Sequence, residues 1–130
     1  MSISFSILLW FSILSFAGIG AAFLLNPLRW AQSIDIRPVS EAGKVDIRAT
    51  YGGGFLALSL FWFWCSLGPA RYEAAVWSMT LVYGGLAMGR ILSWLAGDKL
   101  GRKMVVFLAV EVVAVVWAVW LASTSAEFGH

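Results

Sequence analysis

The chain has 130 residues, of which 61% are hydrophobic and 12% are charged, and its mean hydropathy is +0.85. A chain this short cannot bury that much apolar surface in the core of a soluble domain. The composition therefore excludes a soluble globular domain and indicates an integral membrane protein. The net charge of +2 reports membrane orientation, because basic residues flank the apolar segments. We therefore expect the lipid bilayer, and no nucleic acid, as a partner.

Cysteine and histidine are nearly absent, with Cys65 as the only cysteine and His130 as the only histidine. A single cysteine forms no internal disulfide and no cysteine metal cluster. One histidine at the last position provides no ligand set for haem, chlorophyll, zinc or copper within the bilayer. We expect neither a metal site nor a cofactor.

The first apolar segment runs from residue 3 to residue 25 and stops at Asn26-Pro27. About 20 apolar residues cross the hydrocarbon core as a helix. A cleaved signal peptide is the competing interpretation, but no Lys or Arg precedes this segment and it is longer than a typical signal core. We predict a true membrane span.

Three further spans are predicted at residues 49–67, 74–96 and 104–121. Gly68-Pro69 ends the second, and Ser40 is positioned to cap an amphipathic lead-in, EAGKVDIR. Only the turn GDKLGRK separates the last two, which must therefore form an antiparallel hairpin. The predicted fold is a single all-α domain over residues 1–130, a four-transmembrane-helix bundle with short loops.

Basic residues predict the orientation of this bundle. Four spans place residues 26–48 and the hairpin turn on one side, and Lys- and Arg-rich short loops stay in the cytoplasm. The opposite side carries only Arg71. Both termini are therefore expected on the non-cytoplasmic side of a bacterial inner membrane. The basic side carries Arg29, Arg37, Lys44, Arg48, Lys99, Arg102 and Lys103.

Small residues at helical spacing predict where the helices approach each other, because helices in lipid associate through close backbone contact. Each of the first three spans carries such residues, and the third contains a GxxxG motif. Packing is the simpler interpretation of all of them. The predicted packing residues are Gly18, Ala22, Gly52, Gly53, Gly85 and Gly89.

Two opposite charges are predicted to pair inside the bilayer. Arg90 in the third span and Glu111 in the fourth stand almost equally far from the hairpin turn. At 1.5 Å rise per residue, each lies roughly 10–12 Å from its helix end, so the two are level on adjacent helices. A lone charge in lipid costs several kcal/mol, so pairing is the favourable arrangement.

Other polar residues extend this pair into a predicted pocket: Arg48, Asp46, Tyr51 and Tyr83. In the structural interpretation, the ions fix the register of the helices and nothing binds. In the functional one, the two arginines hold an anionic head group or substrate. The sequence leaves both open and favours the structural one.

The segments DIRATYGG (46–53) and GGLAMGR (84–90) resemble those of a small bacterial integral-membrane family, domain of unknown function 4345. The likeness covers residues 26–96 and implies that Arg48, Tyr51, Gly52, Gly53, Gly89 and Arg90 are its signature residues. The family has no established activity, so the resemblance implies architecture and no reaction. A looser similarity to DoxX-like four-span proteins implies quinone or redox neighbours.

Three functions are compatible with these features. The first is an accessory or assembly subunit that packs against a larger membrane complex or associates with itself, since the chain lacks a Ser/His/Asp set, a CxxC motif and a P-loop. The alternative is a small transporter or a lipid- or anion-binding protein that uses the Arg/Glu pocket. The third is an enzyme that acts on a lipid or quinone, because tyrosines and a carboxylate could supply acid–base groups. The sequence does not fix the geometry of these groups.

Overall fold

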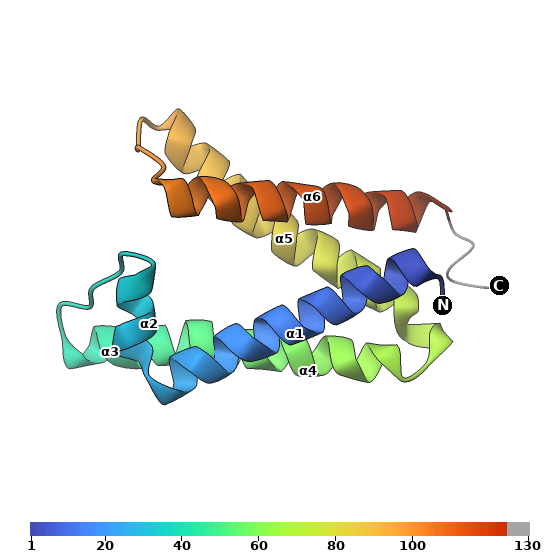
Figure 1. The fold of residues 1–130 in the computed structure, drawn as a ribbon, viewed down its shortest axis with the longest axis horizontal. Coiled ribbons are helices and arrows are strands. Elements are labelled where there is room, and N and C mark those ends of the chain that lie inside the picture. Colours follow the sequence, from blue (N-terminus) through green and yellow to red (C-terminus); the bar gives the residue numbers. More distant parts are fainter. Residues whose placement is uncertain (125–130) are drawn as a thin grey trace. The chain divides into compact units, whose positions relative to one another are not determined.

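The computed structural model describes residues 1–124; residues 125–130, which include His130, lie outside the described residues. The described chain is all-α (Figure 1). In chain order it forms α1 (Ile3–Leu25), α2 (Pro27–Ser33), α3 (Glu41–Ile47), the π-helix η1 (Arg48–Gly54), α4 (Phe55–Ser66), the 3-10 turn η2 (Pro69–Arg71), α5 (Tyr72–Leu95) and α6 (Arg102–Thr124).

Local capping explains where the short helices begin. Asn26 ends α1 and starts α2, since its Oδ1 accepts a hydrogen bond from the backbone N–H of Arg29 at 3.3 Å and Pro27 occupies the first turn. Ser40 caps α3, as predicted, because its Oγ accepts from the N–H of Gly43 at 3.2 Å. These caps fix the connection between α1 and α4.

Helical backbone continues without a break from residue 41 to residue 66, through α3, η1 and α4. The π-helical part contains Gly52, Gly53 and Gly54, and π-helical turns of this kind occur as short insertions within α-helices. The second predicted span, 49–67, therefore begins inside η1 and is completed by the 12 residues of α4.

A Schellman motif ends α5. The N–H of Asp98 donates to the carbonyl of Ser93 and the N–H of Gly97 donates to Trp94, both at 3.1 Å. Gly97 has φ 103°, a conformation that side chains disfavour. The chain then turns and starts α6, which packs antiparallel to α5 as the hairpin interpretation predicts (Figure 1).

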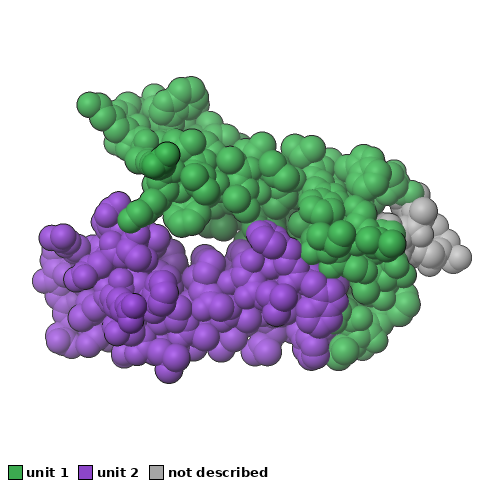
Figure 2. Space-filling view, viewed as in Figure 1, with its two compact units in different colours: residues 1–8, 65–130 green, residues 9–64 purple. Residues whose placement is uncertain are grey.

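The chain divides into two compact units, coloured separately in Figure 2. Unit 1 consists of residues 1–8 and 65–130, and unit 2 consists of residues 9–64. In unit 1, Phe5 packs on Tyr72 with ring centroids 4.9 Å apart, and Trp117 Nε1 donates to Ser4 Oγ at 2.6 Å. Both contacts attach the first turns of α1 to the α5–α6 hairpin.

Unit 2 is built on α1 and α4. Phe16 stacks on Phe55 at 4.7 Å and meets Trp62 edge-on at 4.8 Å. Ser59 Oγ donates to the carbonyl of Ile13 at 2.8 Å, which satisfies a buried hydroxyl. Aromatic packing and this interhelical hydrogen bond therefore join the two helices.

Three helical segments within residues 1–124 are long and apolar enough to cross a membrane: Ile3–Leu25, Pro69–Leu95 and Arg102–Thr124. Apolar side chains also cover much of the exterior, as lipid exposure requires. The chain is thus a small helical protein with several candidate membrane spans.

The glycines that make close contacts differ in part from those the sequence pattern picks out. Gly52 packs against Leu24, whose Cγ would lie 2.9 Å from an added Cβ. The closest approach on α1 is at Gly20 rather than Gly18. An added Cβ would meet nothing within 4 Å at Gly18, Gly53, Gly85 or Gly89, and Ala22 is half-buried. Spacing alone identifies a small-residue stripe without telling which of its residues faces a neighbour.

Candidate functional site

Arg90 and Glu111 form an ion pair between α5 and α6. Arg90 Nη1 donates to Glu111 Oε1 at 2.6 Å and also to the carbonyl of Leu86, one turn earlier, at 3.3 Å. The guanidinium carbon lies 5.6 Å from the ring centroid of Phe107, which precedes Glu111 by four residues on α6. Backbone, carboxylate and aromatic ring together fix the orientation of the guanidinium.

The pair is largely buried within the protein. The Glu111 side chain is 8% exposed and that of Arg90 is 23% exposed. Both lie within segments apolar enough to cross a membrane. Because lipid cannot solvate charge, each ion depends on the other for stability.

Two atoms of this pair have no hydrogen-bond partner among residues 1–124. They are Arg90 Nε, an N–H donor, and Glu111 Oε2, a carboxylate acceptor, and both are buried. A buried polar atom left unpaired costs roughly 1–3 kcal/mol, and native proteins seldom tolerate one. The pair therefore offers one donor and one acceptor to a further polar group.

Charge balance restricts which group that is. Arg90 and Glu111 neutralise each other at contact distance, so the pair carries no net charge toward a ligand. An anion would gain from Arg90 but be repelled by Glu111. A neutral group that both donates and accepts hydrogen bonds matches the two atoms better.

Three of the other predicted pocket residues belong to unit 2. Arg48 is exposed, and its Nε donates to the carbonyl of Leu24 at 3.2 Å. Tyr51 stacks on Phe23 at 5.1 Å, and Asp46 is exposed on α3. Within unit 2, Arg48 therefore satisfies a backbone carbonyl at the end of α1, and the ring of Tyr51 packs against Phe23.

Tyr83 belongs to unit 1, where it is buried on α5. It precedes Arg90 by seven residues, which places both on one face of the helix about two turns apart. That Tyr83, the ion pair and the unit 2 residues form a single pocket stays a prediction.

Residues 1–124 contain no group of three or more His, Cys, Asp or Glu side chains arranged to hold a metal ion. Cys65 is buried and forms no disulfide.

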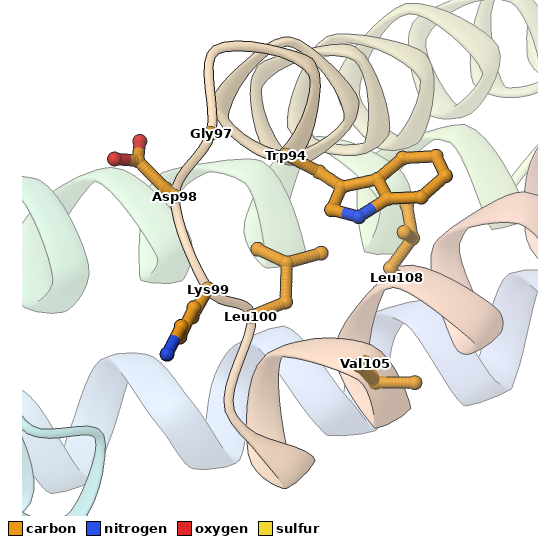
Figure 3. Close-up of a pocket in the computed structure, with 7 residues that line it drawn as sticks. All are labelled: Trp94, Gly97, Asp98, Lys99, Leu100, Val105 and Leu108. Atoms are coloured by element: carbon orange, nitrogen blue, oxygen red, sulfur yellow. The ribbon is translucent and has the colours of Figure 1, made fainter.

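The structure contains a hollow at the α5–α6 turn that the sequence analysis does not predict (Figure 3). Its walls come from the end of α5, the turn and the first two turns of α6, and its volume is about 760 Å³. One sequence signal was available, because Leu100 is an apolar residue in the otherwise polar turn GDKLGRK. The lining residues are Trp94, Gly97, Asp98, Lys99, Leu100, Val105 and Leu108.

The fold and the ion pair define a class: small helical proteins with several candidate membrane spans and a buried charge pair. Comparison with protein families is more specific, since residues 4–122 match the family described as Domain of unknown function (DUF4345). The chain belongs to this family, as the resemblance implied. No curated protein and no solved structure matches the chain. The similarity to DoxX-like proteins is not shown by these comparisons.

Proposed function

We propose that the chain spans the bacterial inner membrane four times, with both termini on the non-cytoplasmic side. Three segments qualify as spans by length and composition, and the unbroken helix over residues 49–66 supports a fourth. The basic residues of segment 26–48 and of the hairpin turn then share the cytoplasmic side, in accord with the positive-inside rule.

We further propose that this membrane protein binds a neutral polar group at the Arg90–Glu111 pair. The observation that carries the proposal is the pair of buried atoms, Arg90 Nε and Glu111 Oε2, which no described residue satisfies. A hydroxyl or a primary amide supplies both a donor for the carboxylate and an acceptor for the guanidinium. The ligand class is therefore an amphiphile with such a group, bound between α5 and α6.

Matched photoreactive probes test this proposal. A long-chain alcohol carrying a diazirine offers a donor and an acceptor, whereas its methyl ether offers only an acceptor. We expect the alcohol to label peptides around Arg90 and Glu111 more strongly than the ether in protein reconstituted in lipid nanodiscs. Mass spectrometry of the digested protein locates the labelled residues.

Two variants provide the decisive comparison. Glu111→Gln puts an amide donor where Oε2 accepts, and Arg90→Met/Glu111→Leu removes both charges together, which avoids an unpaired ion. Both should lose the preference for the alcohol. Glu73→Gln, at an exposed carboxylate on α5, should keep the preference for the alcohol. Equal labelling by the two probes in the wild type, or unchanged labelling in the double variant, would overturn the proposal.

A second candidate is an accessory subunit or a self-associating protein, favoured by the exposed GxxxG motif of α5. Added Cβ atoms at Gly85 and Gly89 would meet nothing within 4 Å, so this face is open to another helix. We expect co-purification with a larger membrane complex, or a dimer, in mild detergent. Gly89→Leu should abolish this association, while Gly53→Leu, at another open glycine, should leave it intact. A monodisperse monomer in the wild type would rule this candidate out.

A further inference from the structure

We propose that the hollow at the α5–α6 turn binds an anionic phospholipid of the cytoplasmic leaflet. This site is separate from the Arg90–Glu111 pair and rests on different residues. It needs only the turn and the two helix ends, all of which belong to unit 1.

The interior of the hollow is apolar. Trp94 from α5, Leu100 from the turn and Leu108 from α6 point toward the shared space (Figure 3). Its volume of about 760 Å³ falls within the range of small-molecule sites. An acyl chain or glycerol backbone fits such a lining, and tryptophan is typical at the level of lipid head groups.

Basic residues adjoin the hollow in the sequence, and one of them, Lys99, lines it. The segment 97–103 carries Lys99, Arg102 and Lys103 against one acid, Asp98. Asp98 Oδ2 accepts a hydrogen bond from Ser93 Oγ at 2.6 Å, so this carboxylate is hydrogen-bonded to the last turn of α5. Lys99 and Asp98 both point outward from the turn in Figure 3. The excess of positive charge in this segment, next to an apolar hollow, complements a lipid with an apolar body and an anionic head.

The depth of the hollow agrees with this occupant. Trp94 follows Arg90 by one helical turn, and Leu108 precedes Glu111 by three residues, so the hollow lies on the turn side of the buried pair. In the proposed topology this is the cytoplasmic boundary of the bilayer, where phosphates lie. A lipid can therefore enter sideways from its own leaflet without crossing the hydrocarbon core.

Native mass spectrometry of detergent-extracted protein tests the proposal. The protein is first equilibrated with vesicles of equal phosphatidylglycerol and phosphatidylcholine content. We expect wild type to retain phosphatidylglycerol preferentially and Lys99→Gln/Arg102→Gln to lose that preference by roughly 100-fold, since each basic side chain that binds the phosphate directly contributes about tenfold. Leu100→Glu should also lose it, because a carboxylate then enters the hollow.

Two controls decide the outcome. Arg37→Gln/Lys44→Gln removes two charges on the same proposed side but from unit 2, and should retain the preference. Arg90→Met/Glu111→Leu should retain it as well, which separates this site from the ion pair. Equal loss in the two charge-removal variants would reduce the effect to general attraction and overturn the proposal. Release of the lipid by millimolar inorganic phosphate would also overturn it, because the site would then recognise a soluble anion.

Discussion

Gly20 of α1 faces Leu56 of α4 so closely that a methyl group on Gly20 would lie 2.7 Å from the backbone nitrogen of Leu56. The same methyl group would lie 2.9 Å from the carbonyl oxygen of Gly52. Both obstacles are backbone atoms, which cannot rotate away as a side chain can. The contact therefore permits only glycine and sets the separation of α1 and α4.

This contact predicts that Gly20→Ala destabilises the protein by about 1–3 kcal/mol, because overpacking forces the helices apart. Gly18→Ala is the matched control, since its added Cβ would meet nothing within 4 Å. Thermal unfolding in detergent, followed by circular dichroism, compares the two. Equal melting temperatures for the two variants would contradict a glycine-specific contact.

For α1, the sequence predicts the length of the helix but not which of its faces packs against α4. Apolar length predicts α1 at 3–25, and the structure has Ile3–Leu25. Helix rotation is harder to predict, since lipid and partner helix are equally apolar and no polar face marks the outside. The stripe through Gly18 and Ala22 is therefore visible in the sequence, whereas the contact at Gly20 follows only from three-dimensional packing.

The ion pair predicts opposite effects of single and double substitution. Glu111→Leu leaves Arg90 buried without its carboxylate and should cost about 3–5 kcal/mol. Arg90→Met/Glu111→Leu removes both ions and should recover most of that loss. A double-mutant cycle on unfolding free energies measures the coupling between the two residues.

An exposed charge, Glu73, provides the comparison for this cycle. Glu73→Leu combined with Arg90→Met should show additive effects, because Glu73 lies near the opposite end of α5. If Glu111→Leu alone leaves stability unchanged, the pair has no structural role.

The Schellman motif of α5 predicts that Gly97→Ala costs about 1–3 kcal/mol, since φ 103° disfavours a side chain. Gly101→Ala, across the same turn, should be close to neutral because space is open around its Cβ. The first variant should also weaken phosphatidylglycerol retention if the turn shapes the hollow. Unfolding midpoints of the two variants give the comparison, and equal destabilisation would contradict the assigned role of Gly97.

The candidate sites were predictable to different degrees. The near symmetry of Arg90 and Glu111 about a short turn gives their height in the membrane, because helical rise is fixed. The unpaired atoms Arg90 Nε and Glu111 Oε2 follow from side-chain geometry that spacing does not define. The hollow was missed because it depends on how α5 and α6 separate at the turn, and on the direction in which Leu100 points.

The hydrogen bond from Trp117 Nε1 to Ser4 Oγ predicts a measurable coupling between the two ends of the chain. Ser4→Ala and Trp117→Phe should each destabilise, and their double-mutant cycle should give a coupling of about 0.6 kcal/mol, the typical value for such bonds in membrane proteins. Trp120, which is 54% exposed, supplies the control: Trp120→Phe combined with Ser4→Ala should be additive. Unfolding free energies in mixed micelles provide both cycles. A coupling of zero for Ser4 and Trp117 would mean that this bond does not attach the start of α1 to α6.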